Sequence, residues 1–151
     1  MHQQCLLTSI TIPIVANNRK HLGDLRGHKI AVWGLAFKPK TDDIRESPAI
    51  SLIDVVIADG GHVSAHDPIA GDNAAKLYGD RINIIDDQYE AAKGAEALIL
   101  VTEWRPYQSP DFGRLKEIMA NPLIIDGRNI WSTYFLQEMG FMYEGVGVIG
   151  N

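Results

Sequence analysis

Short apolar runs alternate with amphipathic segments along the chain, and this alternation predicts an α/β fold. The run Ala97-Leu98-Ile99-Leu100-Val101 is apolar at every position, as expected for a strand of a parallel sheet that is covered on both faces. The pattern favours a Rossmann-like three-layer sandwich with a mainly parallel sheet of five or six strands. The predicted strands are 29–35, 62–66, 82–85, 97–101, 123–126 and, as a possible sixth, 142–148.

The clearest helix is predicted at 48–59. Ser47 can cap it, Pro48 suits its first position, and Gly60-Gly61 can end it. Residues 1–27 do not continue the alternation, and we interpret them as a linker remnant or an arm that precedes a domain at 28–151. Further helices are predicted at 71–78, 87–93, 110–119 and 131–139.

Composition narrows the classes of protein that fit this fold. The chain of 151 residues is long enough for one domain. Its net charge of −5 argues against nucleic acid or an anionic membrane surface as a partner. Cys5 is the only cysteine, which excludes an intramolecular disulfide and favours a reducing, cytoplasmic location. The apolar segment 5–16 is too short to span a membrane and lacks the basic start of a secretion signal.

The loop at 37–48 carries many charges between an apolar strand and the clearest helix. It contains the cations Lys38, Lys40 and Arg45 beside three acidic residues. Because lysine and arginine donate charge-assisted hydrogen bonds to phosphate oxygens, this composition predicts a loop that grips a phosphorylated ligand. The alternative is a solvated loop whose charges pair among themselves. The acidic residues (Asp42, Asp43 and Glu46) are expected to pair with these cations rather than to hold a metal.

Four predicted connections are expected to meet at one edge of the sheet. Ligands of open parallel sheets bind beyond the carboxyl ends of the strands, and each connection follows such an end. At this edge Lys38, Lys40, Arg45 and Arg128 could converge on a diphosphate. The connections are the charged loop, His66-Asp67-Pro68, Thr102-Glu103-Trp104 and Asp126-Gly127-Arg128.

Other side chains at this edge allow two interpretations each. Trp104 and Tyr107 are candidates for stacking on a base, or they pack beneath a loop. Asp67 is a candidate for ribose binding, or it closes the second strand with His66. His62 and His66 share a strand face, but no third ligand is near, so we expect no zinc site.

A dinucleotide-binding fingerprint is not convincing anywhere in the chain. The first predicted strand ends Gly34-Leu35-Ala36, without the second and third glycines of that fingerprint. The run 145–150 has the glycine spacing, but only Asn151 follows, so no helix can receive a pyrophosphate. These observations disfavour a small stand-alone NAD(P) oxidoreductase. A non-catalytic α/β binding or regulatory module, such as a phospho-acceptor domain built on Asp67, stays open as an alternative.

Three motifs resemble one family. The residues 31–38 and 41–48, AVWGLAFK and TDDIRESP, resemble the start of the C-terminal nucleotide-sugar-binding domain of the UDP-glucose/GDP-mannose dehydrogenase family. The residues 101–104, VTEW, and 125–129, IDGRN, resemble two later motifs in the family's order. The resemblance runs roughly from Leu22 to Val148 and is nearest to the UDP-glucose 6-dehydrogenase branch.

This resemblance implies a UDP-glucose-binding domain of an NAD-dependent enzyme that makes UDP-glucuronate for polysaccharide biosynthesis. Phe37, Lys38 and Arg128 match substrate-binding positions, and Arg45 matches an arginine that reaches NAD held by another domain. Cys5 lacks the family's nucleophile motif, so we assign no catalytic residue and expect this chain alone to be inactive. The partners implied are a UDP-sugar, the NAD-binding and central domains outside this chain, and further copies in a homo-oligomer. UDP and GDP both stay open as the nucleotide.

Overall fold

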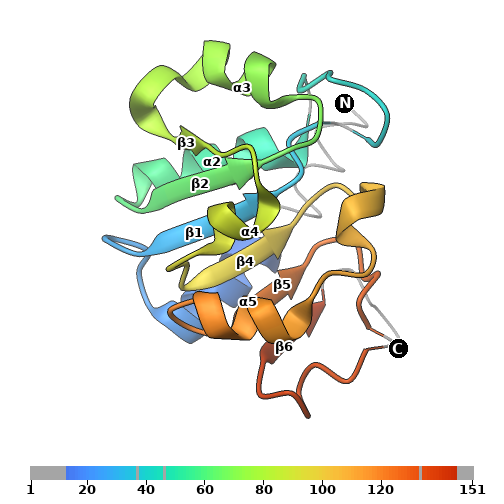
Figure 1. Ribbon diagram of the computed structural model, residues 1–151. Helices are drawn as coiled ribbons and strands as arrows, with labels where there is room; N and C mark the ends of the chain where they lie inside the picture. The colour runs from blue at the N-terminus through green and yellow to red at the C-terminus, as the bar shows by residue number, and fades with distance from the viewer. Residues whose placement is uncertain (1–12, 37, 46, 133, 146–151) are drawn as a thin grey trace.

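The computed structural model describes residues 13–36, 38–45, 47–132 and 134–145, and it contains one six-stranded sheet. The strand order is β3-β2-β1-β4-β5-β6, and every neighbouring pair is parallel (Figure 1). The predicted fold class and the six predicted strands are confirmed, and residues 146–148 of the predicted sixth strand lie outside the described residues. The strands are β1 (Lys29–Trp33), β2 (His62–His66), β3 (Asn83–Ile84), β4 (Ala97–Leu100), β5 (Leu123–Asp126) and β6 (Met142–Gly145).

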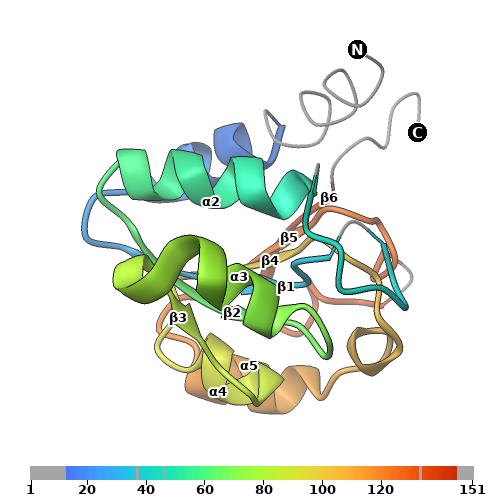
Figure 2. The same cartoon turned by 90° about the horizontal axis from the view of Figure 1, so that it is seen from above.

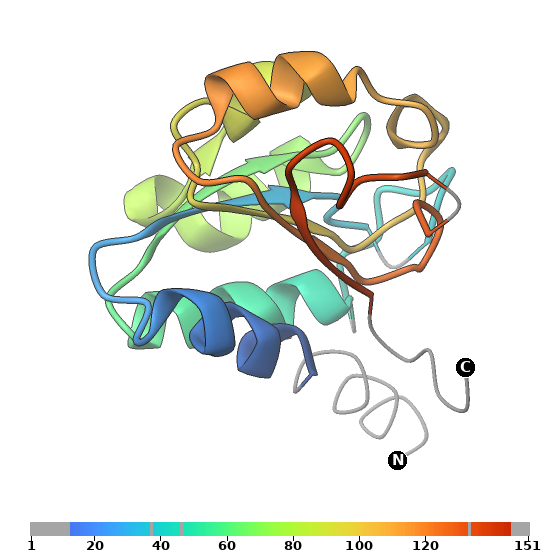
Figure 3. The same ribbon diagram turned by 90° about the horizontal axis from the view of Figure 1, so that it is seen from below.

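Helices cover both faces of the sheet. Figure 2 and Figure 3 show α2 and the helical residues 13–22 on one face, and α4 and α5 on the other. Helix α3 lies beside β3 (Figure 1). The helices are α2 (Pro48–Ala58), α3 (Gly71–Tyr78), α4 (Gln88–Ala92) and α5 (Phe112–Ile118), with short 3-10 turns at Gly79–Arg81 and Arg105–Tyr107.

Helix α2 begins and ends as its sequence predicts. The Oγ of Ser47 accepts a hydrogen bond from the backbone N–H of Ala49 at 3.2 Å, and Pro48 occupies the first helical position. After the helix, Gly60 has a φ of +87°, a conformation that favours glycine. The cap fixes where the charged loop ends and the helix starts.

The prediction of a helix at 131–139 is wrong. The described residues of this segment form turns instead. The backbone N–H of Trp131 donates to the side chain of Asp126 at 2.7 Å, so the segment starts as a turn tied to β5. Successive short turns then bury Trp131 and Leu136, while Phe135 is 74% exposed. Burial of these two side chains therefore decides the path of the chain here, against its helical periodicity.

Residues 13–22 are helical and belong to the packed core. Ile14 and, after the helix, Leu25 are fully buried. The division of the chain at residue 27 stays a prediction. No helix among the described residues is long and apolar enough to cross a membrane.

An aromatic cluster lies beneath the strand-end connections. The rings of Trp33 and Tyr107 stack with centroids 5.0 Å apart, and Trp131 meets Trp33 edge to face at 5.9 Å. The indole N–H of Trp131 donates to the backbone oxygen of Tyr107 at 2.7 Å. The cluster gives the connections after β4 and β5 a common rigid support.

Candidate functional site

The predicted connections lie at one edge of the sheet, at the carboxyl ends of the strands, which we call the strand-end edge. All strands run parallel, so the carboxyl ends of β1, β2, β4 and β5 point to the same side of the molecule, as the arrowheads in Figure 1 show. Leu100, the last residue of β4, pairs in register with Asp126, the last residue of β5. The turns after these two strands are therefore direct neighbours.

A buried carboxylate builds the turn after β5. Asp126 is fully buried, and its Oδ1 accepts from the backbone N–H of Arg128 at 3.0 Å. Its Oδ2 accepts from the backbone N–H of Trp131 at 2.7 Å and from the hydroxyl of Tyr143 at 2.9 Å. Burial, together with this carboxylate, raises the pKa of Tyr143. The tyrosine therefore stays a neutral donor to the carboxylate of Asp126.

Gly127 allows this turn to lie against β4. Its N–H donates to the backbone oxygen of Leu100 at 2.8 Å. A Cβ at this position would lie 2.5 Å from that oxygen, which is inside any normal contact distance. Glycine is therefore required between Asp126, which fixes the turn, and Arg128, which leaves it.

Arg128 is paired with Glu103 from the neighbouring connection. The Oε1 of Glu103 accepts from Nε of Arg128 at 3.0 Å and from its Nη2 at 2.7 Å. The side chains are 40% and 36% exposed, so solutes can reach both. The structure thus places Arg128 at the predicted edge, but beside a carboxylate that sequence reasoning noted only as part of a motif.

Asp67 joins three connections and has no free carboxylate oxygen. It accepts five hydrogen bonds from N–H donors at 2.7–3.0 Å and is 8% exposed. Neither ribose binding nor phosphate acceptance by Asp67 is therefore supported, and its role is to close β2 and tie the connections together. The donors are the backbone N–H groups of Leu35, Ala36, Ile69 and Ala70 and the indole N–H of Trp104.

Trp104 and Tyr107 pack beneath the edge and do not face a ligand. Trp104 is 6% exposed and donates to Asp67, while Tyr107 is fully buried and donates to the backbone oxygen of His66 at 3.0 Å. The hypothesis that they stack on a base is wrong, and the packing alternative is confirmed. His66 is buried beside Tyr107, and this burial lowers the pKa of its imidazole. Within the described ranges no three potential ligands come together to hold a metal.

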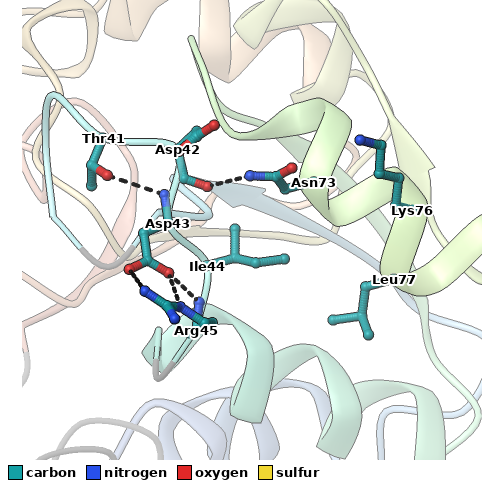
Figure 4. Close-up of a pocket in the computed structure, with 8 residues that line it drawn as sticks. All are labelled: Thr41, Asp42, Asp43, Ile44, Arg45, Asn73, Lys76 and Leu77. Carbon is teal, nitrogen blue, oxygen red and sulfur yellow. Dashed lines mark hydrogen bonds and ion pairs between the residues drawn. The ribbon is translucent and has the colours of Figure 1, made fainter.

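The tip of the charged loop, residues 38–45, is held by contacts within the loop and by a hydrogen bond from α3. Arg45 forms two hydrogen bonds of 3.0 Å with the carboxylate of Asp43, and this pairing lowers the pKa of Asp43. Asn73 of α3 donates to the backbone oxygen of Asp42 at 2.8 Å (Figure 4). Lys38 and Lys40 are exposed. The expected internal pairing is confirmed for Asp43, while Phe37 and Glu46 lie outside the described residues.

A shallow pocket lies between this loop and α3 (Figure 4). Its charged groups are two carboxylates and two cations, so it offers no concentrated positive charge to a diphosphate. Neither Lys38 nor Arg128 lines it, whereas Arg45 does. The lining residues are Thr41, Asp42, Asp43, Ile44, Arg45, Asn73, Lys76 and Leu77.

The connections after β1 and β4 pack closely on each other at the place where this strand order usually binds a dinucleotide. That place is the crevice between the ends of β1 and β4. Gly34, with a φ of +101°, packs so closely on Thr102 that a Cβ would lie 2.5 Å from its backbone nitrogen. The Thr102 hydroxyl also donates to the backbone oxygen of Ala36 at 2.7 Å. Leu35 and Ala36 stand where the fingerprint of a dinucleotide-binding fold has further glycines, which disfavours the stand-alone oxidoreductase.

Comparisons with known proteins show what this chain is similar to. Residues 31–133 match the sequence model of the UDP-glucose/GDP-mannose dehydrogenase family, UDP binding domain. A UDP-glucose 6-dehydrogenase of Pseudomonas aeruginosa is 42% identical over 130 residues, which cover 83% of this chain and 29% of that protein. The enzyme of the same name from Rhizobium meliloti is 45% identical over 125 residues, which cover 83% of this chain and 28% of that protein.

A solved structure extends the likeness to three dimensions. The UDP-glucose dehydrogenase of the hyperthermophilic archaeon Pyrobaculum islandicum has a TM-score of 0.76 and 31% identity, and the match covers 90% of this chain. It covers 29% of that protein. The chain therefore spans less than a third of the length of these relatives.

Proposed function

The chain belongs to the UDP-glucose/GDP-mannose dehydrogenase family, and we propose that it is the UDP-sugar-binding domain of an NAD-dependent UDP-glucose 6-dehydrogenase. One observation carries the proposal: the match to the family's UDP binding domain spans residues 31–133, which include every connection at the strand-end edge. The whole enzyme would oxidise the C6 alcohol of UDP-glucose to the carboxylate of UDP-glucuronate. A cytoplasmic location and a homo-oligomeric enzyme belong to the same proposal.

Within the binding domain, Arg128 and Lys38 contact the diphosphate of the nucleotide sugar, and Phe37 contacts the substrate beside them. What supports this assignment is the exposure of Arg128 and Lys38 at the edge where parallel sheets bind ligands. Arg45 reaches the NAD that another domain holds, as the resemblance of residues 41–48 to the family motif implies. The chain contributes no catalytic residue of its own.

Calorimetric titration of the purified chain with UDP, UDP-glucose, GDP and NAD tests the proposal. We expect weak binding of UDP and UDP-glucose and weaker binding of NAD, because other domains of the enzyme supply part of the contacts. The comparison of UDP with GDP decides the nucleotide. Tight NAD binding without heat from UDP would contradict the assignment. We expect no UDP-glucose-dependent reduction of NAD by this chain alone.

A further inference from the structure

The pairing of Glu103 with Arg128 leaves part of the guanidinium without an acceptor. An arginine side chain has five N–H donors. Glu103 accepts from Nε and from Nη2 through one oxygen, Oε1. Among the residues that the structure describes, none accepts a hydrogen bond from Nη1 of Arg128. One edge of the guanidinium is therefore fixed, while donors remain for a ligand.

Both partners extend from backbone that is itself held in place. On the β4 side, Thr102 is bonded to Ala36, and the indole of Trp104 is bonded to Asp67. On the β5 side, the backbone N–H of Arg128 is bonded to the buried Asp126. The ion pair thus joins two rigid turns, and the freedom it removes is that of the Arg128 side chain itself.

We propose that Glu103 is a positioning residue, which holds Arg128 so that its remaining N–H groups meet the diphosphate of the bound nucleotide. This inference rests on the proposed function of the edge. It explains why an acidic side chain stands beside the arginine of a phosphate-binding site. A long cationic side chain that is already fixed loses less conformational freedom when the ligand binds.

Whether a substitution of Glu103 raises or lowers the affinity for UDP distinguishes positioning from simple charge repulsion. A carboxylate near a phosphate site repels the ligand, so repulsion alone predicts tighter UDP binding whenever this charge is removed. Glu103→Gln removes the charge but keeps a carbonyl oxygen that can accept from Nε and Nη2. Glu103→Ala removes both the charge and the acceptor. Positioning therefore predicts weaker UDP binding by Glu103→Ala and no weakening by Glu103→Gln.

The test is calorimetric titration of UDP into the parent chain and both variants at one fixed salt concentration. We expect Glu103→Ala to weaken binding about twofold to tenfold, the range given by immobilising one long side chain, and Glu103→Gln to bind at least as tightly as the parent. In an Arg128→Ala background, Glu103→Ala should not weaken binding any further, because its partner is absent. Tighter binding by both variants, or unchanged binding by Glu103→Ala, would overturn the proposal.

A measurement without ligand keeps the inference separate from the proposed function. The exchange of the Arg128 Nε–H with water is followed by NMR, with the signal assigned by its loss in Arg128→Ala. We expect slow exchange in the parent and in Glu103→Gln, and faster exchange in Glu103→Ala. Equal exchange in all three would show that Glu103 does not hold the side chain. Failure of the parent to bind UDP would instead contradict the proposed function.

Discussion

The turn after β5 and the tip of the charged loop both carry cations to the same edge, but they are held in different ways. In the β5 turn, the fully buried carboxylate of Asp126 accepts from three donors. In the loop tip, Arg45 and Asp43 bond to each other across two residues, and Asn73 of α3 donates to the backbone oxygen of Asp42. From this comparison we expect Arg128 to be in place before a ligand arrives.

The residues just before the charged loop, Leu35 and Ala36, are anchored in the same way as the β5 turn, whereas the tip of the loop is not. Asp67 binds the backbone N–H groups of Leu35 and Ala36, as Asp126 binds those of its turn. Both carboxylates lie at or just after a strand end. The difference between the regions is therefore how far the anchoring extends. At β5 it includes the cation Arg128, and after β1 the contacts of Asp67 are to the backbone of Leu35 and Ala36.

The largest effect should come from removing the buried anchor. We expect Asp126→Ala to lower the free energy of unfolding by about 3–5 kcal/mol, because it leaves buried donors without an acceptor. Urea denaturation measures this change. Asp43→Ala is the matched control in the loop tip, and it should leave the melting temperature close to that of the parent. Similar destabilisation by both would mean that the two regions are equally anchored.

The second effect concerns the ligand. Arg128→Ala should weaken UDP binding by about 1.5–3 kcal/mol, the value of a hydrogen bond to a charged group. Lys40→Ala should weaken it less, since this exposed loop cation is screened by solvent. Titration of UDP into both variants, after their melting temperatures have been matched to the parent, measures the difference. If Lys40→Ala is the more damaging, the phosphate lies over the charged loop.

The third effect tests the close approach of the β5 turn to β4. Gly127→Ala places a methyl group against the carbonyl oxygen of Leu100, and we expect a loss of about 1–3 kcal/mol in the free energy of unfolding. Gly113→Ala in α5 is the control, because its nearest contact would be an ordinary 3.5 Å and alanine favours a helix. A Gly127→Ala variant as stable as the parent would show that the turn can move away from the strand.

The smallest effect concerns the tie between the loop tip and α3. Asn73→Ala removes the bond to the backbone oxygen of Asp42. We expect cleavage by trypsin after Lys40 to become about twofold to fivefold faster, as the net value of one hydrogen bond suggests. Asn121→Ala, which removes a bond of 3.0 Å to Glu96 away from the loop, is the control. Equal cleavage rates in both variants would mean that Asn73 does not restrain the loop.

Sequence reasoning succeeded where the determining contacts are local or periodic. The strand runs, the capped start of α2 and the pairing of Asp43 with Arg45 each depend on residues close together in the chain. It failed at 131–139, where the periodicity predicted a helix. There the side chain of Asp126 takes the N–H of Trp131, and burial of Trp131 determines the path.

By itself, the sequence determined which connections follow the strands and therefore which side chains stand at the binding edge, because parallel strands bring their carboxyl ends to one side. Only the tertiary structure decided what each side chain does there. Asp67 and Trp104 are far apart in the chain, yet they bond to each other and are withdrawn from any ligand. Glu103 and Arg128 meet because β4 and β5 are neighbours in register. Hydrogen-bond partners chosen across the sheet depend on strand order and register, and no local pattern in the chain encodes them.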